Sequence, residues 1–139
     1  MKKLFITSIL ILILLGYIKP NKNFSLLDYF SGEYNVYTSS YVNPSTDLGF
    51  CYMSDERNDG SNVIGESIKI YNFEPISCLK VLNAELVKTE VLSDGKIVLY
   101  AYTNLITDKV VIDSNEVNLQ IACAEDYCVV GWPLILGSF

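Results

Sequence analysis

The chain has 139 residues, with 10 basic side chains, 16 acidic side chains and no histidine. Without histidine the commonest general base is missing and the usual serine and cysteine triads cannot form, so we expect no enzyme. Six of the basic residues and all sixteen acids follow residue 22, which leaves residues 23–139 with a net charge of minus ten. That charge repels phosphate backbones and disfavours binding to nucleic acid.

Residues 1–22 look like a targeting segment and not part of a folded domain. Two lysines precede an uncharged run at residues 4–18, a pattern typical of export or membrane anchoring. The run predicts an apolar helix, although its fifteen residues are fewer than the ~20 that a spanning helix usually needs. Small residues suited to signal cleavage do not follow it, so a cleaved signal peptide and an uncleaved membrane anchor both stay open. Either one places the remaining chain outside the cytoplasm.

Residues 23–139 have the length of a single compact domain. The first of them, NFSLLDYFSG, predict a short helical turn that Ser25 caps and Gly32 ends. A tyrosine-rich segment, residues 29–52, then contains two strand-like stretches, EYNVYT and GFCYM. The polar, glycine-bearing residues 54–66 predict a loop.

From residue 67 the pattern predicts a strand followed by a helix. SIKIYNF alternates like a strand, and Pro75 suits the first turn of a helix that Asn83 ends. The apolar residues of this helix recur at three-residue spacing and form the face that we expect to pack on a sheet. They are Ile76, Leu79 and Leu82.

A meander of antiparallel strands follows the helix. ELVKTEVL and KIVLYAYT flank the turn Ser93-Asp94-Gly95, and KVVI and EVNLQIACA flank the turn Asp113-Ser114-Asn115. A last turn, Glu125-Asp126, leads into YCVVGW. We therefore predict an α+β fold, a mostly antiparallel sheet with one helix layer, preceded by the N-terminal apolar helix.

The strand IVLYAY, residues 97–102, is apolar on both of its alternating sets, so we expect both faces of the sheet to be covered. The predicted helix covers one face. The tyrosine-rich segment, a second copy of the chain or a partner protein covers the other, and the tyrosine-rich segment is the simplest choice. The uncharged residues 127–139 predict a buried strand that Pro133 bends or ends, followed by LILGSF packing against the core.

Four cysteines permit three disulfide pairings in an oxidising compartment. Cys123 and Cys128 are the nearest pair in sequence and form the candidate disulfide, while buried free cysteines are the alternative. No CxxC pair accompanies them, so we predict no zinc site and no cofactor.

One loop partly matches a calcium-binding pattern. Starting at Asp55, the sequence DERNDGSNVIGE places Asp59 at position 5, Gly60 at position 6 and Glu66 at position 12 of an EF-hand loop. Arg57 at a ligand position departs from that pattern. A solvated loop is therefore the simpler reading, and calcium coordination by Asp55, Asp59 and Glu66 is the alternative.

Tyrosines in the front segment are the candidate partner contacts, because tyrosine is enriched in protein interfaces. They are Tyr34, Tyr37, Tyr41 and Tyr52. Packing of some of these side chains inside the core is the alternative.

The stretches LNAELV, LYAYT, VNLQIA and GWPLILGSF, behind an apolar N-terminal run, resemble short exported proteins of Firmicutes-type bacteria related to the YwmB family. The resemblance covers residues 66–139. It implies a curved sheet like half of the TATA-box-binding-protein fold, a place in the bacterial cell envelope, anchored or secreted, and a link to sporulation. It implies no catalytic residues.

The sequence thus predicts a non-enzymatic protein that acts through contact with another exported protein or with itself. It would reach the membrane through residues 4–18. The alternative is a module outside the cytoplasm that binds a small ligand or calcium at residues 55–66.

Overall fold

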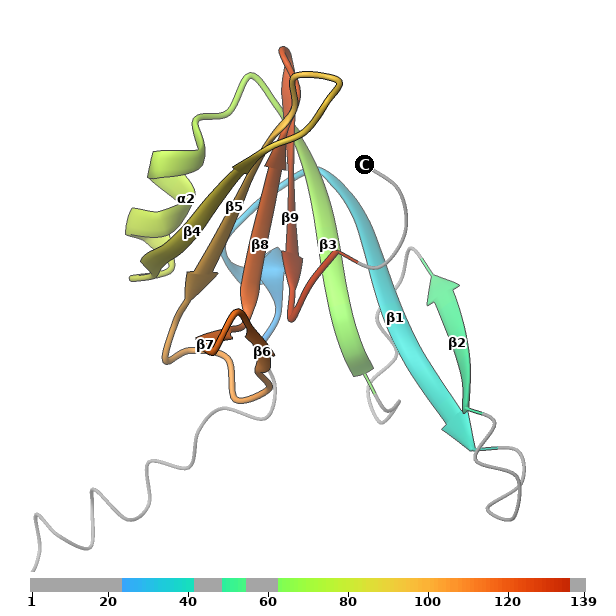
Figure 1. Cartoon of the computed structure of the whole chain (residues 1–139). Helices are drawn as coiled ribbons and strands as arrows, with labels where there is room; N and C mark the ends of the chain where they lie inside the picture. Colours follow the sequence, from blue (N-terminus) through green and yellow to red (C-terminus); the bar gives the residue numbers. More distant parts are fainter. Residues whose placement is uncertain (1–23, 42–48, 55–62, 136–139) are drawn as a thin grey trace, which may run out of the picture.

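The computed structural model describes residues 24–41, 49–54 and 63–135. Most of these residues belong to a seven-stranded sheet in the order β2-β1-β3-β9-β8-β5-β4, and every neighbouring pair is antiparallel (Figure 1). Its strands are β1 (Glu33–Tyr41), β2 (Gly49–Ser54), β3 (Val63–Tyr71), β4 (Glu85–Val91), β5 (Ile97–Tyr102), β8 (Leu119–Cys123) and β9 (Tyr127–Trp132). A hairpin of β6 (Val110–Ile112) and β7 (Asn115–Val117) forms a second, two-stranded sheet.

The fold is mostly antiparallel β, and the predicted α+β architecture with a helix layer is wrong. The described residues contain one α-helix, α2 (Pro75–Val81), and one 3-10 turn, η1 (Leu26–Asp28). Seven helical residues extend only about 10 Å, whereas a nine-residue strand such as β3 extends about 30 Å. A helix of this length cannot form a layer over seven strands.

The predicted N-terminal apolar helix at residues 4–18 lies outside the described residues. Within the part of the chain that the structure does describe, none of the helices combines the length and the apolar character needed to cross a membrane.

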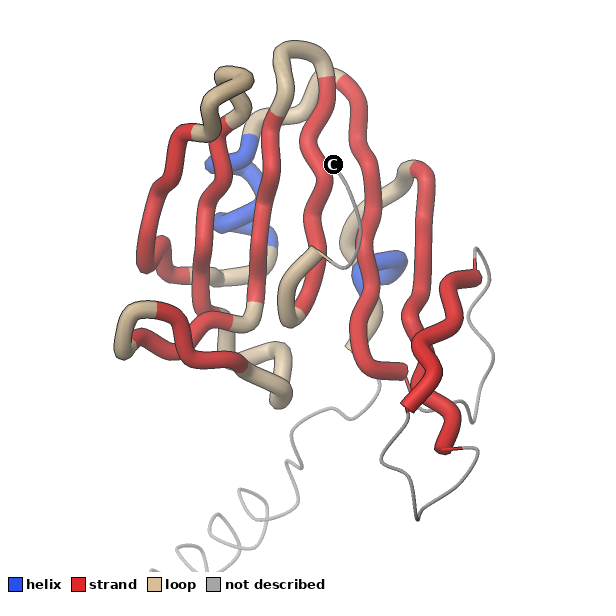
Figure 2. Tube along the Cα trace, turned by 45° about the vertical axis from the view of Figure 1, so that its right-hand side comes forward, coloured by secondary structure: helices blue, strands red, loops and turns tan. Residues whose placement is uncertain are grey.

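The hydrophobic core lies on the face of the sheet that η1 and α2 cover. The register places Ile68, Val130, Ile121 and Leu99 side by side across β3, β9, β8 and β5. All four are buried, and Leu26 of η1 and the helix α2 pack over them. Figure 2 shows η1 and α2 behind the strands on the same side of the sheet. Burial of each large aliphatic side chain contributes about 1.5–3 kcal/mol, so this row is a main source of stability.

Helix α2 turns only part of its predicted face to the core: Leu82 is buried and Leu79 packs against the core, but Ile76 does not. Cys78 and Leu82 are fully buried, whereas Ile76 is 55% exposed. Each helical residue advances about 100°, so a spacing of six residues places Ile76 and Leu82 about 120° apart, while a spacing of four keeps Cys78 and Leu82 on one stripe. Thr103 fixes this rotation, because its Oγ1 donates a 2.6 Å hydrogen bond to the carbonyl of Leu82.

The second face of the sheet is contacted by the residues that follow β9. Strand β9 ends at Trp132, the next peptide bond to Pro133 is cis, and the chain turns back over the sheet. Ile135 N donates a 2.8 Å hydrogen bond to Gln120 Oε1. The tyrosine-rich segment does not cover this face, contrary to our expectation, because residues 33–41 and 49–54 pair into the sheet as β1 and β2. Residues 136–139 lie outside the described part of the chain.

Gly131 should be essential for this turn, and we expect Gly131→Ala to destabilise the protein. An ideal Cβ at residue 131 would lie 2.7 Å from Ile135 Cγ1 and 3.1 Å from Ile135 Cα. Forcing extra atoms into packed sites typically costs about 1–3 kcal/mol. Urea denaturation measures the loss, and the double variant with Ile135→Ala should recover part of it. Equal stability of Gly131→Ala and the parent chain would contradict this packing.

Candidate functional site

Glu66 is the centre of a buried hydrogen-bond cluster that joins three distant parts of the chain. Its side chain is fully buried in β3. Oε1 accepts hydrogen bonds from Ser25 Oγ at 2.8 Å and from the hydroxyl of Tyr34. Oε2 accepts from the backbone N of Leu26 at 2.9 Å and from Trp132 Nε1 at 2.6 Å. The carboxylate therefore ties η1, β1 and the end of β9 to β3.

This cluster explains what Glu66 does and counts against its predicted role in calcium binding. A carboxylate has about four lone-pair positions, and the four donors fill them. Strand β3 begins at Val63, so Glu66 belongs to a strand and not to the predicted loop. Asp55 and Asp59 lie outside the described residues. Among residues 24–41, 49–54 and 63–135, no three His, Cys, Asp or Glu side chains are grouped as metal ligands.

Two of the four tyrosines predicted to contact a partner are buried instead. Tyr34 is 8% exposed and Tyr37 is 7% exposed, so neither offers a contact surface. Tyr34 lies in the Glu66 cluster, where its hydroxyl has a partner. Tyr41 pairs with Gly49, and Tyr52 pairs with Thr38, in the β1–β2 ladder, but their side chains lie outside the described part of the structure.

The structure joins Cys123 and Cys128 in a disulfide across the β8–β9 hairpin. The two residues are direct partners in the ladder, with Cα atoms 4.2 Å apart, so the bridge closes the end of this hairpin. Cys78 is free and fully buried in α2. Burial raises the pKa of its thiol to about 12, which leaves almost no thiolate at neutral pH and makes Cys78 unsuitable as a nucleophile.

Strand β4 carries the least covered apolar side chains of the sheet. Val91 is 69% exposed, its ladder partner Ile97 is 44% exposed, and Leu86 is 45% exposed. Ile97 alternates with the core residue Leu99, and paired residues share a face, so these three side chains lie on the helix side. We call Leu86, Val91 and Ile97 the β4 strip. Helix α2 leaves it open to solvent, and Ile76 and Val81 of this helix are exposed as well.

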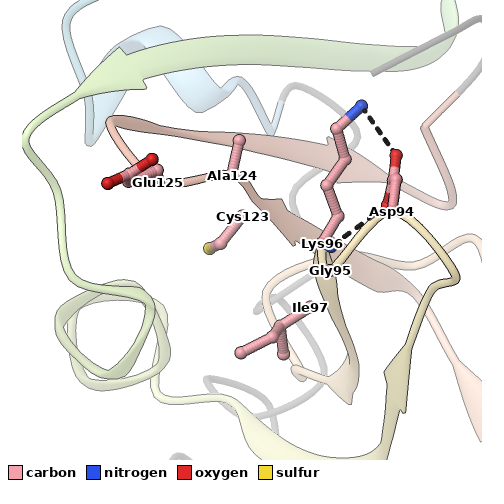
Figure 3. A pocket seen from close by; sticks show the side chains of 7 residues that line it. All are labelled: Asp94, Gly95, Lys96, Ile97, Cys123, Ala124 and Glu125. Atoms are coloured by element: carbon pink, nitrogen blue, oxygen red, sulfur yellow. Dashed lines mark hydrogen bonds and ion pairs between the residues drawn. The ribbon is translucent and has the colours of Figure 1, made fainter.

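A hollow of about 440 Å³ lies at the turn end of the β4 strip. Its walls come from the β4–β5 turn and from the end of the β8–β9 hairpin (Figure 3). The residues that line it are Asp94, Gly95, Lys96, Ile97, Cys123, Ala124 and Glu125. Figure 3 shows Ile97 and the sulfur of Cys123 on one side of this space and the Glu125 carboxylate at its rim. The hollow thus offers an apolar wall with an acidic rim.

The two lysines near the strip form ion pairs with acidic side chains, whereas two of the glutamates near it do not. Lys88 is held by Asp113 at 2.8 Å, and this contact raises the lysine pKa. Asp94 accepts a hydrogen bond from the backbone N of Lys96, which lowers the pKa of that carboxyl, and the Lys96 ammonium lies 3.4 Å away. Glu90 and Glu125 are exposed and make no ion pair with another described residue. The net charge around the strip is therefore negative.

On the second face of the sheet, at the height of Val91 and Ile97, the charged and aromatic side chains contact one another. Lys69 Nζ lies 4.1 Å from the ring centroid of Tyr127 and 5.3 Å from that of Tyr71, and the two rings are in edge contact. The Tyr71 hydroxyl donates to Glu33 at 3.3 Å. Hydrogen bonding with Tyr71 and these neighbours raise the pKa of Lys69, so the ammonium stays charged. These side chains contact one another, so the described residues form no strip of exposed apolar side chains at this place.

Comparisons with known proteins gave no relative for this chain. No family model, no curated protein and no solved structure matches it. The resemblance to the YwmB family therefore stays a prediction. The candidate site rests on the geometry of the β4 strip alone.

Leu86, Val91 and Ile97 are not among the site residues predicted from the sequence. A signal for it was present, because both alternating sets of IVLYAY are apolar while only one short helix follows from the sequence. The neighbouring strand β4 was the part of the face that this helix could not reach.

Proposed function

We propose that this protein is a non-enzymatic, exported binding protein that contacts another protein outside the cytoplasm through the β4 strip. The observation that carries the proposal is the exposure of Leu86 and Val91 on one face of the edge strand β4, together with Ile97, which pairs with Val91 from β5. Contiguous exposed apolar surface on a soluble domain is typical of interaction sites. The targeting pattern at residues 1–22 supports a location where the partner is also exported.

The character of the other polar groups supports binding over catalysis. Glu66 is buried and fully engaged, Cys78 is buried, and the chain contains no histidine. None of these is an acid, base or nucleophile open to a substrate. The hollow beside the strip suits a partner side chain, because it has an apolar wall and an acidic rim.

Site-specific crosslinking of the full chain in its native host tests this proposal. A photoreactive amino acid replaces Val91, and a matched chain carries it at Val111 of the β6–β7 hairpin, which is 70% exposed. We expect one discrete adduct from residue 91 and none from residue 111. The substitution Val91→Asp should abolish capture by a crosslinker at Ile97, because it places a charge inside an apolar contact.

Two outcomes would contradict the proposal. A chain that gives no adduct at residue 91 has no partner on the strip. Identical adducts at residues 91 and 111 would mean that exposed apolar residues are captured without specificity.

A further inference from the structure

Strand β4 has a free edge, and only part of it is open to pairing. It ends the strand order of the sheet, so no other described strand pairs with its outer side. The ladder to β5 is irregular between Leu86 and Lys88, and Lys88 is held by Asp113 of the β6–β7 turn. A bulge and a lysine on an edge strand are devices that protect sheet edges from added strands. They protect the first half of β4 and leave Thr89–Val91 exposed.

The backbone groups of this exposed segment point away from the sheet. Leu92 N donates to Lys96 O at 2.8 Å, and Leu92 O accepts from Gly95 N at 3.0 Å, so the polar groups of Leu92 face the β5 side. Backbone direction alternates along a strand. The N–H and C=O groups of Val91 and Thr89 therefore point to the free edge, where an added strand would find them.

The side chains around this edge determine the chemistry of an added strand. Val91 and Ile97 offer apolar contact on the helix face. Glu90 lies on the opposite face of β4. Because Lys88 and Lys96 already lie next to acids, the uncompensated charge near the segment is negative. A strand with alternating apolar and basic residues complements both faces.

We propose that Thr89–Val91 receives an extended, basic and apolar segment of the partner, which adds an eighth strand to the sheet. The segment places an apolar side chain against Val91 on the helix face and directs the alternate basic side chain to Glu90 on the opposite face. This inference rests on the proposed function and specifies the kind of partner. A second copy of the chain is a poorer occupant, because β4 itself carries two glutamates, Glu85 and Glu90, and the body is strongly acidic.

Two synthetic peptides test the charge requirement on the full chain in detergent micelles. One is a nine-residue peptide of alternating valine and lysine, and the other replaces each lysine with glutamate. Isothermal titration at low ionic strength should give binding of the lysine peptide that is at least about tenfold tighter than that of the glutamate peptide. Raising the salt concentration should weaken it, because the charges are exposed. Equal binding of both peptides would overturn the inference.

A proline variant separates strand addition from general charge attraction. Thr89→Pro removes the outward N–H without changing the charge, and proline is tolerated on an edge strand when its missing N–H faces solvent. We expect Thr89→Pro to bind the lysine peptide at least about tenfold more weakly than Thr89→Ala. Equal binding by these two variants would also overturn the inference.

The fold of the proline variant is checked separately. An unchanged far-ultraviolet circular dichroism spectrum shows that the sheet is intact, and Val91→Asp provides a second test if Thr89→Pro unfolds. The crosslinking experiment distinguishes partner binding at the β4 strip from the addition of a strand at Thr89–Val91. A partner adduct at residue 91 that persists in Thr89→Pro would leave the proposed function standing and remove strand addition.

Discussion

Replacing Glu66 with leucine should destabilise the protein by about 4 kcal/mol, because it leaves buried donors without an acceptor. Leucine has a similar volume, so the effect of packing is small. The backbone N–H of Leu26 and the Nε1–H of Trp132 cannot become acceptors, and each stays unsatisfied in a buried place. Equilibrium unfolding in urea, followed by tryptophan fluorescence, measures the change.

Glu66→Gln should cost much less, about 1–2 kcal/mol, and the difference identifies the mechanism. The amide oxygen can accept from Leu26 N and Trp132 Nε1, while the hydroxyls of Ser25 and Tyr34 can rotate to accept from the amide NH₂. The matched control is Glu116→Leu, whose side chain is 52% exposed and should change stability by about 0.5 kcal/mol or less. Equal losses for Glu66→Leu and Glu116→Leu would refute the role of the cluster.

The Glu66 cluster illustrates what the sequence does not contain. The partners of Glu66 are separated from it by 41, 40, 32 and 66 residues, so no local pattern relates them. The same carboxylate fits a calcium-loop spacing, because position 12 of that pattern is a glutamate. Only the register of β3 against β1 and β9 shows that its side chain points into the core.

Strands and turns were predictable because their signals are local. The turn at Gly95 has a positive φ of 88°, which glycine adopts without strain, and Asp113 and Ser114 also have positive φ values, as a tight hairpin requires. Asn83, with φ of 46°, follows α2 as predicted. Alternation of apolar residues located β5 and β9 to within one residue at each end, whereas β3 begins four residues earlier than predicted and EVNLQIACA, predicted as one strand, divides into β7 and β8.

The fold class was wrong because a helix was given more weight than its length supports. Pro75 and Asn83 bound α2 closely, and seven residues cannot cover a sheet of seven strands. The two strands predicted in the tyrosine-rich segment, EYNVYT and GFCYM, are confirmed as parts of β1 and β2, but they extend the sheet, whereas we expected the segment to lie over it. A segment that packs over a sheet and a segment that adds strands to its edge contain the same kinds of apolar residues. Composition alone therefore does not tell which of these arrangements a segment adopts.

The candidate site was missed for a related reason. Val91 and Ile97 are exposed because α2 does not cover this part of the sheet. The rotation and position of the helix determine which part it covers. That rotation depends on Thr103, whose hydroxyl contacts the carbonyl of Leu82 from 21 residues away. The loop that holds Thr103 in place therefore also shapes the face that we propose as the binding surface.

Asn118 holds this loop, and Asn118→Ala should destabilise the protein by about 3 kcal/mol. The side chain is fully buried between β7 and β8. Its Oδ1 accepts from Thr103 N at 2.8 Å, and its Nδ2 donates to Thr103 O at 2.8 Å and to Ile106 O at 2.9 Å. Alanine leaves all three backbone groups without these partners. Urea denaturation measures the loss.

Asn118→Asp should be at least as harmful as alanine at neutral pH, because a carboxylate oxygen would replace the NH₂ group that faces two carbonyl oxygens. Its deficit should shrink as the pH falls, since a protonated carboxyl donates to one of them, whereas the alanine deficit should not change in this way. Asn115→Ala, at an exposed residue of the neighbouring turn, is the control and should cost about 0.5 kcal/mol. If Asn118→Ala were no more harmful than Asn115→Ala, the loop would be held by packing, and the position of α2 would not depend on this amide.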